Sequence, residues 1–444
     1  MYGILKRTLA PVLTAGAVML AAGSAQAFCG FYVAGGDAKL FNEASKVVMV
    51  RDRDRTVITM ANDFQGDVKE FAMVVPAPTV LKRKQIHVTE NAIIDHLDAY
   101  TAPRLVEYFD ANPCRRRLKL MRRSDTMAEP SVGASAPESE KSLGVKVEAE
   151  YTVGEYDIVI LSAKESDGLT TWLKQNGYRI PDGAEDVLGS YIAQDMKFFV
   201  ARVNLKKHAK SGNTYLRPLQ IAFESKKFML PIRLGTVNSR GKQDLLLWTL
   251  TRKGRVETAN YRTERMPTGQ EIPVYVKKNF GPVYKAIYGN AVERAGGAGV
   301  LMEYAWDMGW CDPCAADPLS ARELKELGVY WIKGDTSRGA DVFVTRLHAR
   351  YDAESFPEDL RLIETGDRSN FQGRYVMRHP WTGNEQCREA DEYRRSLPAR
   401  FECEAQALAS LTGWDINKIR AEMSKSGFKP GEEERSWIER LWER

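Results

Sequence analysis

The sequence has 444 residues, of which 43% are hydrophobic and 28% charged, which excludes a disordered chain, a polytopic membrane protein and a low-complexity fibre. Its 64 lysine and arginine residues against 59 aspartate and glutamate residues leave a net charge of +5, too small for a dedicated nucleic-acid binder with a large basic field. A globular protein with one large domain, or with two or three domains, remains.

The N-terminus has the pattern of a signal peptide over residues 1–27. Lys6 and Arg7 form a positive region, an uncharged apolar stretch follows over 9–22, and Ala25-Gln26-Ala27 is the small-residue pattern that signal peptidase cleaves. An uncleaved anchor helix is the alternative, although the apolar stretch is short for a permanent span. We therefore predict cleavage near Ala27, a periplasmic or secreted location, and no transmembrane segment in the mature chain.

Strands and helices alternate in the first part of the mature chain. The β-branched runs over 46–62 predict a β-hairpin, and 71–75 predicts a third strand. A helix is predicted to begin near Thr89, and Pro103 predicts a second helix that runs to Phe109.

The composition then changes. Basic residues crowd the stretch Arg115–Arg123, and the residues after it are poor in large apolar side chains, which predicts a flexible loop near 124–143. Two interpretations of the basic cluster stay open: a contact for anionic lipid or polymer, or a solvated helix face.

The rest of the chain predicts an α+β fold with mixed or antiparallel sheets, because groups of strands are separated by helix pairs. The predicted strands are 145–149, 156–161, 198–203, 216–223, 228–234 and 244–250, and the predicted helices are 167–177 and 184–194. A helical C-terminal appendage is predicted after residue 380, with segments 387–396, 399–412, 415–426 and 432–443 divided by proline and glycine. Residues 28–380 would form the α+β body and 381–444 the helical region.

All six cysteines follow the predicted cleavage site, and an even number in an oxidising compartment indicates disulfides. They are Cys29, Cys114, Cys311, Cys314, Cys387 and Cys403. Sequence alone does not choose among the possible connectivities. Proximity suggests the pairs Cys311–Cys314, Cys387–Cys403 and Cys29–Cys114.

One cysteine pair lies in the motif Trp310-Cys311-Asp312-Pro313-Cys314, between a predicted strand and a predicted helix. This arrangement resembles the active site of the thioredoxin family. The resemblance implies that Cys311 is the attacking thiolate and Cys314 the resolving thiol. The negative charge of Asp312 opposes thiolate formation, and a structural disulfide in a turn is the alternative interpretation.

No metal site and no cofactor are predicted. A Cys-x-x-Cys half-site needs a second pair of ligands, and the histidines are scattered. They are His87, His96, His208, His348 and His379. His96 lies in an otherwise apolar predicted helix, which favours a structural histidine over a general base. Hydrolase signatures and phosphate-binding loops are missing from the sequence.

Several stretches together resemble an uncharacterised bacterial family, catalogued as domain of unknown function 2330. They are LFNEAS at 40–45, MANDFQGD at 60–67, FAMVVPAP at 71–78, LSA at 161–163 and TWLKQNGY at 171–178. The resemblance implies an exported or envelope-associated protein. It implies no activity, cofactor or catalytic residue.

We therefore predict an exported, disulfide-stabilised α+β protein with a binding or structural role in the cell envelope. Its partner would be an envelope protein or ligand, not a nucleic acid. The alternative is a thiol-disulfide oxidoreductase that uses Cys311 and Cys314.

Overall fold

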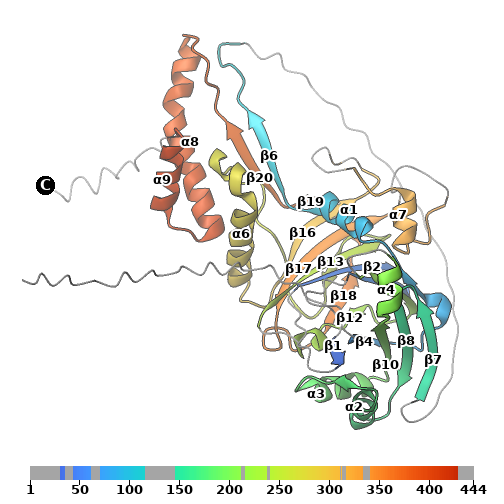
Figure 1. The fold of residues 1–444 in the computed structure, drawn as a ribbon. Coiled ribbons are helices and arrows are strands. Elements are labelled where there is room, and N and C mark those ends of the chain that lie inside the picture. The colour runs from blue at the N-terminus through green and yellow to red at the C-terminus, as the bar shows by residue number, and fades with distance from the viewer. Residues whose placement is uncertain are drawn as a thin grey trace, which may run out of the picture.

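The computed structural model describes residues 31–35, 44–61, 71–115, 146–211, 216–237, 241–310, 312, 317–333 and 341–428. The predicted signal peptide, the loop near 124–143 and the last predicted helix lie outside these residues. The architecture is α+β, as predicted, with two large sheets, helices on their outer sides and a helical C-terminal region (Figure 1).

The larger sheet has nine strands, and its pairing is mixed. The order along the sheet is β15 (Thr263–Arg265), β16 (Val300–Asp307), β17 (Phe343–Tyr351), β13 (Gln243–Thr251), β2 (Ala44–Asp52), β3 (Arg55–Ala61), β11 (Leu219–Glu224) and β5 (Ile86–Val88), with β19 (Phe371–Gln372) beside β16. Strands β2 and β3 confirm the predicted hairpin. The centre of the sheet pairs β13 with β2 in parallel, so two distant parts of the chain meet there.

The smaller sheet has six strands, all antiparallel in pairing. Their order is β7 (Lys146–Val153), β8 (Tyr156–Ser162), β10 (Lys197–Val203), β4 (Phe71–Ala77), β1 (Phe31–Gly35) and β9 (Tyr178–Arg179). Helices α2 (Ser166–Gln175) and α3 (Ala184–Ile192) cover its outer face, where Leu169, Leu188 and Phe198 share one buried cluster.

The two sheets share the main hydrophobic core. Because successive strand residues point to opposite faces, Met73 and Val75 of β4 meet the core that also holds Val47 and Met49 of β2. The alternate residue of β2, Val48, belongs instead to a second cluster under α1 (Asn91–Thr101) and α7 (Ala321–Glu326). The nine-stranded sheet is therefore buried on both faces.

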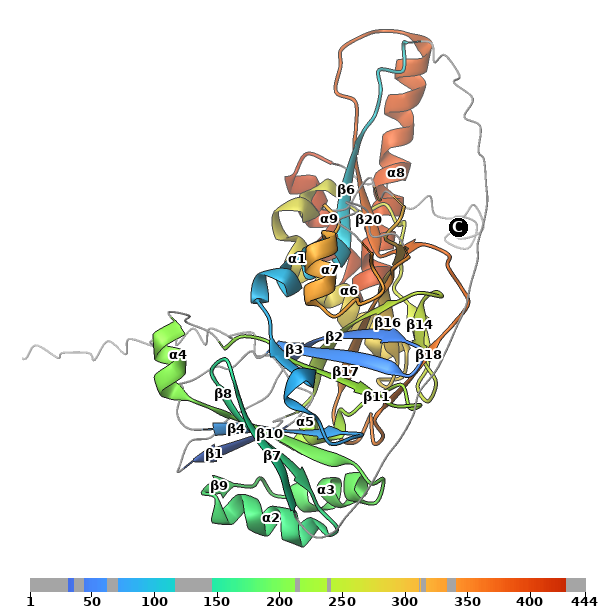
Figure 2. The same ribbon diagram turned by 90° about the vertical axis from the view of Figure 1, so that its right-hand side faces the viewer.

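A two-stranded ribbon, formed by β6 (Arg104–Phe109) and β20 (Arg374–His379), extends from the sheets (Figures 1 and 2). The predicted helix from Pro103 to Phe109 is wrong, because these residues pair in parallel with a strand that comes far later in the chain. Such non-local pairing overrides local helix signals.

The first C-terminal helix packs on α6 (Phe280–Arg294) beside this ribbon, and the second packs on the first (Figure 2). One continuous helix, α8 (Arg388–Thr412), replaces the two segments predicted on either side of Pro398, and α9 (Ile416–Lys425) follows it. Proline costs one backbone hydrogen bond inside a helix. Burial of Phe401, Ala405 and Leu408 on the α6 side gives the helix tertiary contacts that offset this cost.

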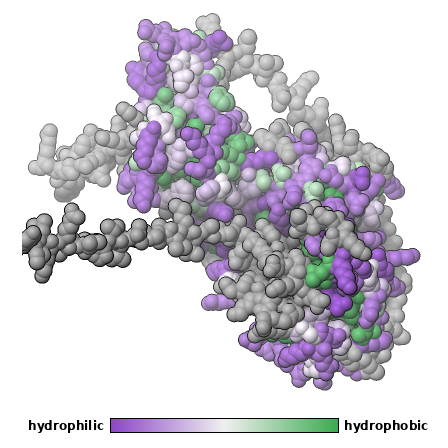
Figure 3. Space-filling view, viewed as in Figure 1, coloured by the Kyte–Doolittle hydropathy of each residue, from purple (hydrophilic) through white to green (hydrophobic). Residues whose placement is uncertain are grey.

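Short elements complete the described chain. They are α4 (Leu205–Ser211), α5 (Arg233–Val237), the 3-10 helices η1 (Arg83–Gln85) and η2 (Val274–Asn279), and a small sheet of β12 (Met229–Leu230), β18 (Leu360–Glu364) and β14 (Val256–Thr258). The predicted strand over 228–234 is thus divided between β12 and α5. Hydrophilic residues cover most of the coloured surface in Figure 3. Within the described ranges, no helix has both the length and the apolar character needed to cross a membrane.

Candidate functional site

A buried carboxylate lies at a β-bulge in the nine-stranded sheet. The pairing of β16 with β17 shifts register between Met302 and Tyr304, and Glu303 is the extra residue. A bulge takes the side chain out of the regular alternation of the strand. Glu303 has an exposed fraction of 0%, so its charge requires partners inside the protein.

Three side chains bind this carboxylate. The Tyr284 hydroxyl donates to Oε1 at 2.5 Å, His348 Nδ1 lies 2.7 Å from the same oxygen, and Arg346 Nε donates to Oε2 at 2.6 Å. Burial acts to raise the pKa of Glu303, but the charges of Arg346 and His348 outweigh it and lower the pKa to about 2. The carboxylate is therefore ionised at neutral pH.

The network continues through Arg346 to helix α1. Arg346 Nη1 donates to Asp98 Oδ1 at 2.5 Å, and Lys46 Nζ lies 3.0 Å from the other oxygen of Asp98. Burial acts to lower the pKa of Arg346, while Glu303 and Asp98 raise it and leave it above its usual value. Acidic and basic groups thus alternate across the sheet, and α1 is tied to β16 and β17 by them.

At the other end of the network, His348 packs under α6. Its ring stacks on Tyr288 with centroids 3.7 Å apart, and the next charged residue on the same face of β17, Arg350, forms a paired contact with Asp244 at 2.8 and 3.0 Å. These residues hold one another in a buried, charge-compensated arrangement. A carboxylate with so low a pKa is a poor general base at neutral pH. Its three donors tie α6 and β17 to β16.

The described part of the cysteine motif is anchored next to this network. Asp312 Oδ2 accepts hydrogen bonds from the Tyr304 hydroxyl at 3.1 Å and from Gln372 Nε2 at 2.9 Å. Tyr304 follows Glu303 on β16, and its burial raises the pKa of its hydroxyl. Cys311 and Cys314 lie outside the described residues, so their pairing and reactivity stay predictions.

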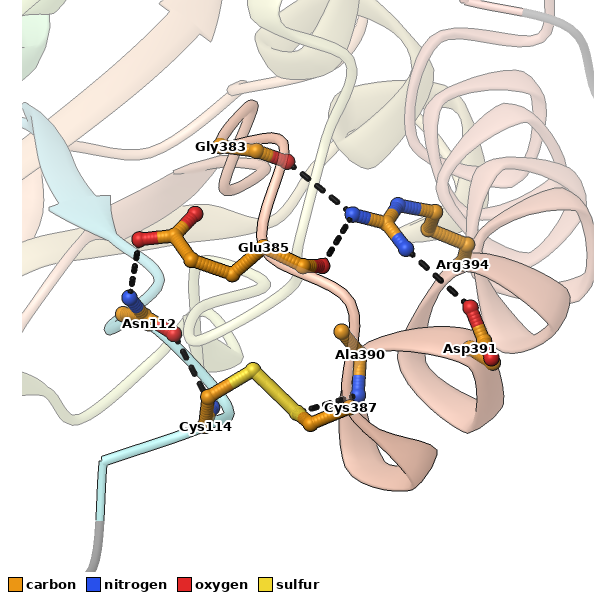
Figure 4. The surroundings of a disulfide bond; sticks show 8 residues. All are labelled: Asn112, Cys114, Gly383, Glu385, Cys387, Ala390, Asp391 and Arg394. Atoms are coloured by element: carbon orange, nitrogen blue, oxygen red, sulfur yellow. Dashed lines mark hydrogen bonds and ion pairs between the residues drawn. A yellow bond between two sulfur atoms is a disulfide. The ribbon is translucent and has the colours of Figure 1, made fainter.

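A disulfide joins Cys114, after β6, to Cys387, at the start of α8, with Cα atoms 6.0 Å apart (Figure 4). Hydrogen bonds surround it: the Cys114 N–H donates to Asn112 Oδ1 at 2.9 Å, and Asn112 Nδ2 donates to Glu385 Oε1 at 2.7 Å. Arg394 donates to the Glu385 carbonyl at 2.9 Å. The ribbon end and the start of α8 are therefore fixed together.

This bond corrects two of the predicted pairs. Cys403 lies on the same continuous helix that begins after Cys387, more than four turns along it, which places it about 24 Å away along the axis. Disulfides need Cα atoms within about 7 Å, so the predicted Cys387–Cys403 pair is wrong. Cys403 is free and exposed. The predicted Cys29–Cys114 pair is also wrong, because Cys114 is bonded to Cys387; Cys29 itself lies outside the described residues.

A second ionic cluster joins Asp110, just after β6, to helix α8. Asp110 Oδ2 accepts hydrogen bonds from the Tyr393 hydroxyl at 2.6 Å and from Arg400 Nη1 at 2.5 Å. Glu404, one turn after Arg400 on α8, lies 3.3 Å from Arg400 Nε. Burial raises the pKa of Glu404 to about 7; Arg400 opposes the shift, and the negative charge of Asp110 adds to it. The Glu404 carboxyl therefore changes charge near neutral pH.

Replacing Glu404 with glutamine is expected to stabilise the protein above pH 7 by about 1–2 kcal/mol. The pKa of about 7 in the folded state exceeds the ordinary value of 4.5, so the contribution of Glu404 to stability is fully present below pH 4.5 and is lost as pH rises through 7. Urea unfolding at pH 5 and pH 8 measures the effect, which should be small at pH 5. The exposed Glu392 on α8 offers a control, Glu392→Gln, and an equal gain from both variants would contradict the expectation.

Away from the Glu303 network, the described residues form two hollows that could hold a ligand. One, of about 390 Å³, lies over β7, β8, β10 and α2 and is lined among others by Tyr151, Asp157, Trp172 and Arg202. The other, of about 280 Å³, lies where β3, β4 and β11 of the two sheets come together. None of the residues of the Glu303 network lines either hollow.

The described histidines are held by neighbouring groups. His96 Nδ1 lies 2.7 Å from Glu323 Oε1, and its Nε2 lies 2.9 Å from the carbonyl of Asp317, so it joins α1 to α7 as a structural residue. His379 contacts Glu107 at 2.8 Å, and His87 contacts the carbonyl of Lys84 at 3.0 Å. In the part of the chain that the structure describes, no three His, Cys, Asp or Glu side chains form a group that could hold a metal ion.

Comparison with known proteins identifies a family. The chain matches no curated protein and no solved structure. Residues 23–363 match the bacterial family described as "Uncharacterized protein conserved in bacteria (DUF2330)", which confirms the resemblance found in the sequence. The match includes Cys114, the Glu303 network and the cysteine motif, whereas β20, α8 and α9 follow it. The chain therefore belongs to this uncharacterised bacterial family.

Proposed function

We propose that the protein is exported to an oxidising compartment, where it has a binding role and the disulfide serves as a structural brace. The observation that carries this proposal is the Cys114–Cys387 bond, which links residues 273 positions apart. Disulfides persist in secreted and periplasmic proteins and are rare in the cytosol. The signal-peptide pattern before Ala27 supports the same location.

The environment of the acidic side chains favours a binding role over a catalytic one. In the Glu303 network, the buried Glu303 and the half-buried Asp98 are held by Arg346 and neighbouring donors. Hydrolytic or acid-base chemistry needs a titratable group that faces a hollow and has a shifted pKa.

One of the acids that line the hollow of about 390 Å³ is Asp157. Burial acts to raise its pKa, but hydrogen bonds from Asn204 and Thr152 and the charge of Lys207 lower it, so it is a poor general base at neutral pH. Most of the other lining side chains in the two hollows are aromatic, apolar or polar and are suited to holding a ligand.

Expression of the full chain in a Gram-negative bacterium tests the location. We expect the mature protein in the periplasmic fraction, with Phe28 as its first residue by N-terminal sequencing. The matched control is Ala25→Arg with Ala27→Arg, which should block cleavage by removing the small residues that the peptidase requires. Uncleaved wild-type protein in the cytosolic fraction would contradict the proposal.

The alternative is a thiol-disulfide oxidoreductase that uses Cys311 and Cys314. An activity assay distinguishes it from the proposed function. Asp312, which follows Cys311 directly in the sequence, carries a negative charge that disfavours a thiolate at Cys311, and its carboxylate is held by Tyr304 and Gln372. We expect no acceleration of insulin reduction by dithiothreitol in the presence of the mature protein. Rapid reduction that is lost in Cys311→Ser and retained in Cys403→Ser would establish the oxidoreductase instead.

A further inference from the structure

The hollow at the junction of the two sheets has an apolar floor. Ile58 of β3 and Phe223 of β11 come from the larger sheet, while Pro76 of β4 and Met196, just before β10, come from the smaller one. All four are buried, so the floor is fixed by packing on both sides. With a volume of about 280 Å³, the cavity lies at the small end of ligand pockets.

The rim of the same cavity is cationic. Lys226 and Lys227 lie on the turn between β11 and β12 and are exposed, and Gln194 accepts a hydrogen bond from Lys227 Nζ at 3.3 Å. All the residues that line this cavity are in the described ranges, and none of them is acidic. The nearby acid Asp195 pairs with Lys197 at 2.6 Å and does not line the cavity.

A buried arginine holds the lysine turn in place. Arg51 Nη1 donates to the Ser225 carbonyl at 2.9 Å and Nη2 to the Lys226 carbonyl at 3.4 Å. The guanidinium carbon of Arg51 also lies 5.2 Å from the centre of the Phe228 ring. The two ammonium groups are therefore carried by a turn whose backbone is anchored, at the mouth of an apolar cavity.

We propose that this cavity binds a small anionic amphiphile, a carboxylate with a medium-length alkyl chain. The chain would fill the floor formed by Ile58, Phe223 and Met196, where apolar surface leaves water. The carboxylate stays at the rim with Lys226 and Lys227, because a carboxylate buried without partners is strongly unfavourable. This inference rests on the proposed binding role, to which it gives a site and a ligand class; it does not depend on export, so the fractionation experiment and the titrations below can fail independently.

Isothermal titration of the mature protein with octanoate, octanol and octylammonium tests the charge preference. We expect octanoate to bind at least about fivefold more tightly than octanol, and octylammonium more weakly than either, because the rim is cationic. From hexanoate to octanoate, the affinity should rise about threefold to fourfold per methylene. Equal affinity for octanoate and octanol would overturn the recognition of the carboxylate, and no saturable binding of any probe would overturn the ligand site.

Substitutions locate the binding. Lys226→Gln together with Lys227→Gln should weaken octanoate about five- to tenfold and leave octanol unchanged, since only the charge contacts are removed. Met229→Trp, which places a large side chain in the lining, should weaken both probes. The control Lys285→Gln, at an exposed position on α6, should change neither. An unchanged octanoate affinity in the double lysine variant would contradict the proposal.

Discussion

Replacing Glu303 with alanine is expected to lower the free energy of unfolding by about 3–5 kcal/mol. The variant leaves Arg346, which is buried, without the carboxylate 2.6 Å from its Nε, and it removes the acceptor of Tyr284 and His348. Arg346 keeps Asp98 as a partner, but removing one carboxylate from a buried ion-pair network costs far more than the intact network contributes. Urea unfolding at pH 7, followed by tryptophan fluorescence, measures the loss.

A matched control separates the network from charge loss in general. Glu358 forms an exposed pair with Arg361 at 2.8 Å, and Glu358→Gln should change the free energy of unfolding by less than about 0.5 kcal/mol. A Glu303→Ala variant as stable as this control would show that the network carries no stabilising role.

Acid should act on the wild type through the same residue. The pKa of Glu303 falls from 4.5 to about 2 in the folded state, so its stabilising contribution is present above pH 4.5 and is lost as pH falls towards 2. Glu303→Gln, which does not titrate, should therefore show a weaker loss of stability over this interval.

Removing the disulfide is the second large change. The double variant Cys114→Ser with Cys387→Ser is expected to lose about 3–5 kcal/mol, because the bond closes a loop of 273 residues and so restricts the unfolded chain. The loss should also reach the ribbon, since Asn112, Glu385 and Arg394 form their hydrogen bonds around the bond. Amide hydrogen exchange in β6 and β20 should become faster than in the central strands β13 and β17.

The free cysteine supplies the control for this variant. Cys403→Ser, at an exposed position of α8, should leave the unfolding transition within about 0.5 kcal/mol of the wild type. Dithiothreitol should lower the free energy of unfolding of the wild type and of Cys403→Ser by the same amount. It should not cause this loss in the double variant, which has no Cys114–Cys387 bond to reduce. Equal stability of the double variant and the wild type would mean that the bond is no brace.

Local patterns in the sequence predict many of the elements. The hairpin over 46–62, the strand after residue 71 and the helix after Thr89 have the alternation or helical spacing that their packing requires, and the structure confirms each. Residues 104–109 form a strand because they pair with β20, and α8 continues past Pro398 because the helix packs on α6. Both departures depend on partners distant in the chain, which local propensity does not contain.

The site was harder to predict than the fold, because its residues look ordinary until the strands pair. Arg346, His348 and Arg350 alternate with apolar residues on β17, a visible sign of one polar face in a buried strand. Glu303 stands alone in an apolar strand, and only the bulge shows why it points to Arg346. Proximity in the sequence is a poor predictor of disulfide pairs where a continuous helix separates two cysteines, as α8 separates Cys387 from Cys403.

The most direct test of a disulfide-braced, exported protein is a peptide map of the mature chain from the periplasm, digested without reductant after free thiols are blocked. We predict a cross-linked species that joins the peptides containing Cys114 and Cys387, with Cys403 recovered as a blocked free thiol. Recovery of Cys114 and Cys387 as blocked thiols, or of Cys387 linked to Cys403, would contradict it.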